Sequence, residues 1–222
     1  MPIRSVSNTG SHELSTSVAN KVIRNTYSLL SMTLVFSAIC AAVSTTLNFG
    51  LHPLLNLVVM IGLLFAIQWQ RNSVMALPLT FAFTGFAGFT LGPILNMYLA
   101  MANGGEIIMT ALGLTGIIFA GLSFYAITTR KDFSFLRGFL FVGILALVGV
   151  SLIGLFVDLS GIQLAMAAAA VILFSGFILY DTSNMVHGGE TNYVLMTVSL
   201  YLNILNLFTA LLQLVGAFSN DD

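Results

Sequence analysis

The stretch "IIMTALGLTGIIFAGLSFYAI", residues 107–127, contains no charged side chain from end to end. A helix needs about 20 mainly apolar residues to cross the hydrocarbon core of a bilayer, so this stretch predicts a transmembrane helix. Six other runs have the same character and similar length: 27–47, 53–69, 76–99, 135–157, 162–186 and 193–217. The sequence therefore predicts an all-α membrane protein with seven transmembrane helices.

The composition supports this class and excludes several others. Of the 222 residues, 58% are hydrophobic and only 7% are charged, whereas a soluble globular protein has roughly 25% charged residues. The single cysteine, Cys40, excludes an internal disulfide and a cysteine-rich metal site. A net charge of −1 without a basic patch argues against nucleic-acid binding. Since the sequence shows no P-loop, dinucleotide fingerprint or nucleophile–base pairing, we expect a protein that is not an enzyme and that needs no cofactor or metal.

The positive charges predict the orientation of the chain in the membrane. With seven spans, all the basic residues fall on one side: Arg4, Lys21, Arg24, Arg71, Arg130, Lys131 and Arg137. The positive-inside rule places that side, and the N-terminus with it, in the cytoplasm, and it places the C-terminus outside. We expect a polar cytoplasmic tail over 1–25, a transmembrane domain over 26–218 and a short C-terminal tail over 219–222. The first 15 or so residues contain too few apolar side chains to offset the cost of ordering, so we expect them to be flexible.

The third run contains the stretch "FAFTGFAGFTLGPILN", residues 81–96, in which small residues follow a helical spacing. One face of the predicted helix carries Gly85, Gly88, Gly92 and Asn96. Small residues allow neighbouring helices in a membrane to approach closely, whereas Pro93 is expected to kink the helix. The pattern favours helix packing and also fits a hinge or a break that lines a pore.

The seventh run carries a polar stripe. At about 100° per residue, five polar side chains fall within an arc of roughly 80°: Asn192, Ser199, Asn203, Asn206 and Gln213. Exposure of such a stripe to lipid would cost free energy, so we expect it to point into the bundle and the seventh helix to be central. It fits a seam of hydrogen bonds between helices, or the lining of a polar path.

In the sixth run, Asp181 is the first charged residue after about twenty uncharged ones. We expect the helix to continue to about His187, which places Asp181 one to two turns inside the cytoplasmic membrane face with Asn184 beside it. An ionisable group at this depth is usually functional, and a protonation-sensitive latch between the sixth and seventh helices is one interpretation. A carboxylate that reaches interfacial water, or a hydrogen-bonded structural acid, is the other.

The stretch "HGGET", residues 187–191, has one His and one Glu, which is too little for a zinc site. We expect a turn that ends the sixth helix with Gly188 or Gly189 at its C-terminus, while Glu190 and Thr191 help to start the seventh helix.

Three stretches together resemble a known family. "FAFTGFAGFTLGPILN" (81–96), "ITTRKDFSFL" (127–136) and "HGGETNYVLMTVSLYLNILNLF" (187–208) look like the Bax-inhibitor (TMBIM-like) membrane proteins. The similarity covers about 20–218 and is closest to the bacterial branch that modulates the membrane protease FtsH. It implies six helices in two layers around a central seventh, in the bacterial inner membrane. It also implies FtsH, with its associated membrane complex, as partner, and slower degradation of membrane substrates such as the translocon subunit SecY.

Other bacterial members of this family are described as pH-sensitive calcium leak channels, and this is the alternative function that the resemblance implies. They use two aspartates, of which Asp181 matches the first, whereas Asn203 stands at the second position. An Asp–Asn pair can hydrogen-bond but cannot share a titrating proton as two carboxyls do. We therefore expect a polar latch of Asp181, Asn203, Asn184 and Asn206, with the modulator function ahead of the channel. The lipid bilayer is a partner under both readings, and calcium only under the channel reading.

Overall fold

The computed structural model describes residues 9–47, 50–154 and 156–219, and every regular element in them is helical. The elements are α1 (Thr9–Leu47), α2 (Pro53–Gln70), α3 (Ala76–Leu99), α4 (Gly104–Thr129), α5 (Leu136–Ile153), the short 3-10 helix η1 (Ser160–Ile162), α6 (Gln163–Val186) and α7 (Tyr193–Phe218). All seven α-helices are long and apolar enough to cross a membrane, which confirms the predicted set of spans. Arg4 and the residues after Ser219 lie outside the described part of the chain.

Two helix boundaries differ from those expected. Helix α1 begins at Thr9, so the expected polar tail is helical from that residue onward, well before the apolar run starts at residue 27. No proline stands between Pro2 and Pro53 to end a helix, and a helix need not stop where the membrane does. Helix α5 ends at Ile153, several residues before the expected 157, because Gly154 forms its C-cap.

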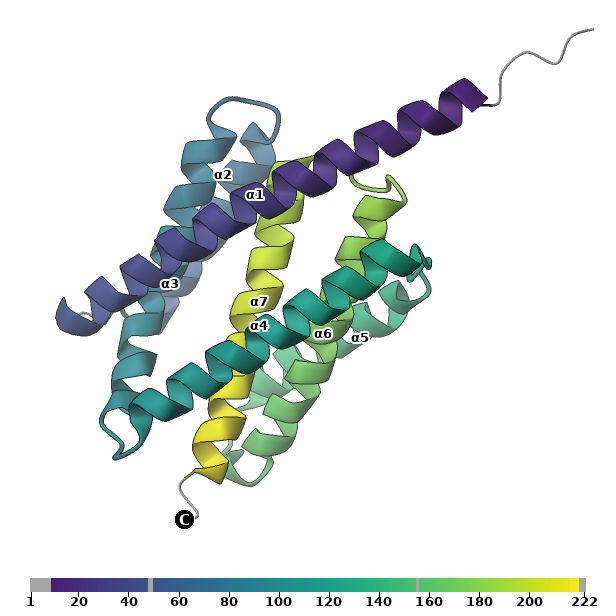
Figure 1. Ribbon diagram of the computed structural model, residues 1–222. Coiled ribbons are helices and arrows are strands. Elements are labelled where there is room, and N and C mark those ends of the chain that lie inside the picture. The colour runs from purple at the N-terminus through teal and green to yellow at the C-terminus, as the bar shows by residue number, and fades with distance from the viewer. Residues whose placement is uncertain (1–8, 48–49, 155, 220–222) are drawn as a thin grey trace, which may run out of the picture.

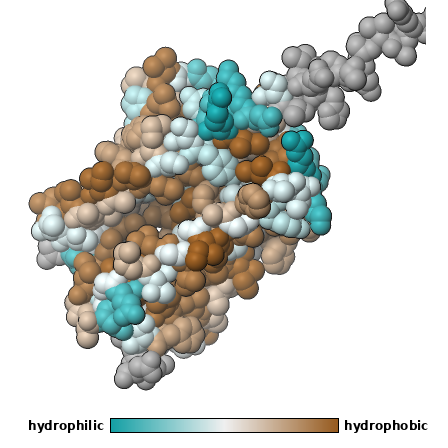
Figure 2. All heavy atoms as spheres, in the orientation of Figure 1, coloured by the Kyte–Doolittle hydropathy of each residue, from teal (hydrophilic) through white to brown (hydrophobic). Residues whose placement is uncertain are grey.

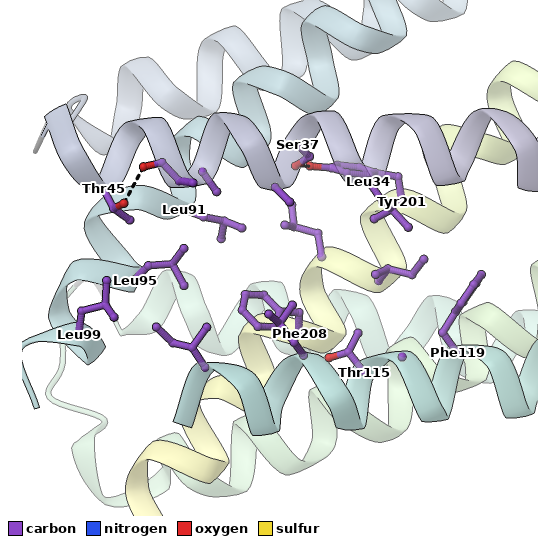
Figure 3. A pocket seen from close by; sticks show the side chains of 18 residues that line it. Leu34, Ser37, Thr45, Leu91, Leu95, Leu99, Thr115, Phe119, Tyr201 and Phe208 are labelled. Carbon is purple, nitrogen blue, oxygen red and sulfur yellow. Dashed lines mark hydrogen bonds between the residues drawn. The ribbon is translucent and has the colours of Figure 1, made fainter. Parts of the chain in front are cut away.

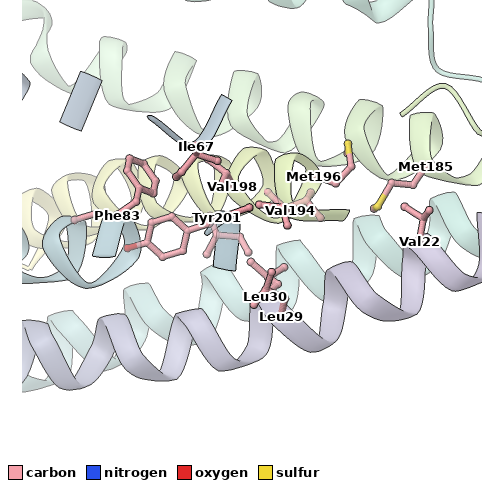
Figure 4. Packing of buried hydrophobic residues seen from close by; sticks show 14 residues of the cluster. Val22, Leu29, Leu30, Ile67, Phe83, Met185, Val194, Met196, Val198 and Tyr201 are labelled. Atoms are coloured by element: carbon pink, nitrogen blue, oxygen red, sulfur yellow. The ribbon is translucent and has the colours of Figure 1, made fainter. Parts of the chain in front are cut away.

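Helix α7 is the most buried of the spans. Two thirds (67%) of its most apolar segment is buried, compared with 6% for α2 and for α5. It packs against α1, α3, α4 and α6, whereas α2 packs mainly on α3 and α5 mainly on α6. Figure 1 shows α7 running behind α1 and α4, and Figure 4 shows Val194, Val198 and Tyr201 of α7 among buried side chains of the neighbouring helices.

The outer surface suits a lipid environment. Hydrophobic side chains cover most of the face seen in Figure 2, and hydrophilic ones gather near the ends of the helices. Large apolar side chains such as Phe65, Ile117 and Phe124 are about 70% exposed on α2 and α4. The bundle therefore buries its seventh helix and presents apolar side chains outward.

Candidate functional site

Asp181 lies on α6 where that helix packs against α7. The side chain is buried, with 7% of its surface exposed. Its Oδ2 atom accepts two hydrogen bonds, from Ser199 Oγ at 2.6 Å and from Asn203 Nδ2 at 2.8 Å. Ser199 and Asn203 are four residues apart on α7, so they lie one above the other on the face that meets α6. We call Asp181, Ser199 and Asn203 the α6–α7 polar site.

The other two residues of the expected latch do not bond to this carboxyl. The Asn206 amide donates to the carbonyl of Leu202 in its own helix at 2.8 Å. The side-chain oxygen of Asn184 lies against Gly189 of the following turn, so close that a Cβ there would overlap it. Ser199 belongs to the predicted polar stripe but not to the predicted latch. Its spacing of four from Asn203 is the signal that could have added it.

The polar stripe of α7 faces inward only in part. Asn203 is buried, whereas Ser199 and Asn206 are half-buried and Gln213 is exposed. Gln213 stands near the C-terminal end of α7, close to where the helix leaves the expected membrane core. Asn192 instead caps the helix, since its Oδ1 accepts from the backbone N–H groups of Val194 at 3.0 Å and Leu195 at 3.2 Å.

The chemistry available to the α6–α7 polar site is that of one carboxyl facing two neutral donors. It can accept hydrogen bonds across the helix contact, and gain or loss of its proton changes the charge at that contact. Within the described residues, no group of three or more His, Cys, Asp or Glu side chains could hold a metal ion. The site thus has the character of a hydrogen-bonded connection between α6 and α7.

The end of α6 is also bonded to the connection between α4 and α5. Ser183 Oγ donates to the carbonyl of Lys131 at 3.0 Å and accepts from the Phe133 backbone N–H at 3.1 Å. The two ring nitrogens of His187 lie near carbonyl oxygens, Nδ1 at 2.8 Å from Ser183 and Nε2 at 3.1 Å from Arg130. A neutral imidazole can donate to only one of these oxygens, whereas an imidazolium can donate to both.

The same connection carries an exposed carboxyl, Asp132. Its Oδ1 accepts a hydrogen bond from the backbone N–H of Ser134 at 2.8 Å, which lowers the pKa of Asp132 below its ordinary value. The nearby His187 adds a smaller effect in the same direction. The stretches 127–136 and 187–208, far apart in sequence, therefore meet at one end of the bundle.

The turn between α6 and α7 follows the expected chemistry with one correction. His187 is the C-cap of α6, and the next residue, Gly188, has a φ of 71°, a conformation that favours glycine. Glu190 does not cap α7 itself. Its carboxylate accepts from the backbone N–H of Asn192 at 2.8 Å, and the Asn192 amide donates to the carbonyl of Arg71 at 2.9 Å. The start of α7 is thereby joined to the connection between α2 and α3.

The glycines of α3 lie against α1. A Cβ atom on Gly85 would overlap the ring of Phe36, and one on Gly88 would overlap the carbonyl oxygen of Ser37. A Cβ atom on Gly92 would likewise overlap the side chain of Ser44. The Asn96 amide donates to the carbonyl of Thr45 in α1 at 3.1 Å. Pro93 lies inside α3, which continues to Leu99.

Comparison with known proteins identifies the family of the chain. Residues 19–220 match the family described as inhibitor of apoptosis-promoting Bax1. A membrane protein of Vibrio cholerae serotype O1 is 51% identical over 207 residues, which cover 91% of this chain and 92% of that protein. The modulator of FtsH protease YccA from Escherichia coli K12 is 47% identical over 203 residues, with the same coverage. The counterpart from Escherichia coli O6:H1, also 47% identical, is called inner membrane protein YccA. The chain therefore belongs to the Bax-inhibitor family of membrane proteins.

Proposed function

We propose that this protein is a non-enzymatic modulator of an FtsH-type membrane protease in a bacterial inner membrane. The observation that carries the proposal is the 47% identity, over 91% of the chain, with the Escherichia coli protein named for this activity. The seven apolar helices are consistent with a partner whose transmembrane part lies in the same bilayer. Membrane substrates such as SecY are the proteins whose degradation it would slow.

The proposed mechanism is lateral docking beside the protease as a poorly extracted substrate. We propose the peripheral helices α2 and α5 as the docking surface, since they are the least buried of the spans. An unfoldase needs a segment to pull, and the N-terminal part of the chain is the handle we propose. The close contact of α1 with α3 and the hydrogen bonds of the α6–α7 polar site resist extraction, because each holds two membrane-spanning helices together.

The proposal includes the arrangement in the membrane. We place the N-terminus in the cytoplasm and the C-terminus in the periplasm, with six helices in two layers around α7. The burial of α7 and its contacts with four other helices support this arrangement. Alkaline phosphatase fused after the last residue should be active if the C-terminus is periplasmic. An inactive but stable fusion would mean that the C-terminus lies in the cytoplasm and that the proposed topology is wrong.

Reconstitution tests the modulator function directly. Purified protein and the membrane protease are placed in the same proteoliposomes, and degradation of a membrane substrate and of a soluble unfolded substrate is followed in parallel. Lateral docking predicts a dose-dependent slowing of the membrane substrate alone, together with co-purification of the two proteins. Equal slowing of both substrates would point to inhibition of the protease motor. No slowing and no binding would reject the proposal.

The handle has its own test. Deletion of residues 2–15 should slow the protein's own turnover by the protease while leaving its thermal unfolding unchanged. Unchanged turnover would reject the N-terminal part as the segment that is pulled.

A second candidate function is a cation leak gated at Asp181, and the observation that favours it is the burial of this carboxyl at the contact of α6 with α7. This function predicts that Asp181→Asn changes the pH dependence of calcium flux into liposomes. An identical pH profile in the variant would remove Asp181 from any gating mechanism.

A further inference from the structure

An apolar groove opens between α1 and α4. The cavity measures about 500 Å³ and has its floor on α7, at Tyr201, Ile204 and Phe208 (Figure 3). Helix α3 contributes Leu91, Leu95 and Leu99. Every residue that lines the groove belongs to a helix long and apolar enough to span the membrane. The groove therefore lies at the depth of the lipid acyl chains.

The opening exists because its two walls do not close on each other. Both α1 and α4 pack on α3 and on α7, but in the described part of the chain they make at most a weak contact with each other. Small residues line the walls at Ala38 and Ala42 of α1 and at Gly116 of α4, and all three are exposed. A Cβ atom added to Gly116 would meet no other atom within 4 Å. The groove is thus open sideways, toward the surrounding lipid.

The polar side chains in the lining are already satisfied by the protein. Tyr201 donates its hydroxyl hydrogen to the carbonyl of Thr84 at 3.0 Å and accepts from Ser37 Oγ at 2.6 Å. Thr45 and Thr115 each donate at 2.7 Å to carbonyl oxygens of their own helices. A stable buried water needs two to four free polar partners, and this lining offers few. The chemistry of the groove suits a hydrocarbon rather than an ion or a polar solute.

The length and volume of the groove fit a single hydrocarbon chain better than a helix. The lining runs from Leu34 to Thr45 along α1, about 16 Å at 1.5 Å per residue, which is close to half of the ~30 Å hydrocarbon core. A cavity of about 150 Å³ holds the six carbons of benzene, so about 500 Å³ has room for on the order of one chain of 16 to 18 carbons. Two turns of a helix about 10 Å across would occupy roughly 850 Å³, more than the groove offers.

We propose that the groove between α1 and α4 binds one acyl chain of a bilayer phospholipid. The end of the groove near Thr45, Leu99 and Ile108 lies beside the α1–α2 and α3–α4 connections, on the side of the bundle away from Arg71 and Arg130. The chain therefore enters from the leaflet on that side. The bound lipid fills a space that α1, α3, α4 and α7 leave open, and so becomes part of the packing of the bundle.

Photolabelling tests the proposal. The protein is reconstituted into vesicles of phosphatidylethanolamine and phosphatidylglycerol that contain a phosphatidylethanolamine with a diazirine on one acyl chain. Illumination is followed by mass-spectrometric mapping of adducts. In the native sequence, adducts at Ala38 and Ala42 should exceed those at Ile117 and Phe124, which face lipid on α4 and serve as internal reference.

Two glycine variants give the decisive comparison. Gly116→Leu places a side chain in the groove and should lower the adducts at Ala38 and Ala42 by roughly tenfold, the scale on which a few carbons change binding to an apolar pocket. Gly113→Leu is the matched control, because Gly113 is on the same helix, has equally open space and does not line the groove. It should leave the adducts unchanged.

Three outcomes would overturn the proposal. Adducts at Ala38 and Ala42 that are no more frequent than at the reference positions would mean that the groove holds no lipid. An equal fall in both variants would mean that the effect is not local to the groove. Disulfide dimers of Gly116→Cys in a Cys40→Ala background, without groove adducts, would assign the groove to a second copy of the protein.

Discussion

Helix pairs α1–α3 and α6–α7 make the two most extensive helix contacts of the bundle, and they are built in different ways. The first depends on the absence of side chains, since Gly85, Gly88 and Gly92 bring α3 against α1. The second depends on the presence of polar groups, since the carboxyl of Asp181 on α6 meets donors on α7. The comparison predicts that α1–α3 is sensitive to added volume, whereas α6–α7 is sensitive to a lost hydrogen-bond partner.

The largest effect is expected when volume is added to the first contact. Gly88→Leu would push a side chain into the backbone carbonyl of Ser37, so α1 must move away from α3. Overpacking of this kind costs about 3 kcal/mol of the free energy of unfolding. A thiol-reactive dye measures it, because Cys40 is a partly buried free thiol on α1 that reacts faster when the helix separates.

Gly121→Leu is the control for Gly88→Leu. Nothing lies within 4 Å of a Cβ atom at that position, so this variant should change the free energy of unfolding by less than about 0.5 kcal/mol. Equal destabilisation by the two variants would show that close approach of α1 and α3 does not set the stability of this contact.

The second contact should fail when its acceptor is removed. Asp181→Ala leaves the hydroxyl of Ser199 and the amide of Asn203 without their partner and should lower the free energy of unfolding by about 2 kcal/mol. Asp181→Asn keeps one acceptor oxygen and should cost less than about 1 kcal/mol. Thermal unfolding in detergent distinguishes the two, and an alanine variant as stable as the native protein would contradict the hydrogen-bonded role of Asp181.

The two contacts also differ in how far the sequence predicted them. The glycine face of α3 follows from helical periodicity alone, because glycines three and four residues apart must share a face. Periodicity does not say which helix that face meets, and the partner, α1, is known only from the structure. The seven spans were predictable for the same local reason, since each is a continuous apolar run.

The residues of the α6–α7 polar site were harder to predict from the sequence. The pairing of Asp181 with Asn203 is implied by the resemblance to a family, and Asn184 and Asn206 are predicted in the latch because Asn184 shares a helix face with Asp181 and Asn206 shares one with Asn203. Which side chain reaches across a contact depends on the rotation of both helices, and that rotation brought Ser199 to the carboxyl and left Asn206 on its own backbone. The groove between α1 and α4 was not predictable, because it results from a contact that two distant segments do not make.

Asn203→Asp sharpens the comparison by placing a second carboxyl in the polar site. The Asn203 amide lies 2.8 Å from Asp181 Oδ2, so two ionised carboxylates there would repel each other, whereas a shared proton would hold them together. The stabilising form is the protonated one, so the variant should match the native protein near about pH 5 and lose roughly 1.5 kcal/mol of stability as the pH rises toward about 8. Unfolding temperatures of both proteins across this range measure the difference. A pH-independent difference would mean that the two carboxyls do not share a proton.

The smallest effect is expected at Asn206. This variant tests whether every polar side chain of α7 stabilises the bundle, or only those that bond to another helix. Asn206 donates to the Leu202 carbonyl one turn back on its own helix, so Asn206→Ala removes no bond between helices and gains some helix propensity. It should change the free energy of unfolding by less than about 0.5 kcal/mol, whereas Asn203→Ala, which removes a bond to Asp181, should cost about 1 kcal/mol. Both residues lose the same amide, so the difference between the two variants isolates the bond that crosses the contact. If Asn206→Ala proved as costly as Asn203→Ala, the whole polar stripe, rather than the three side chains of the polar site, would hold α7 in place.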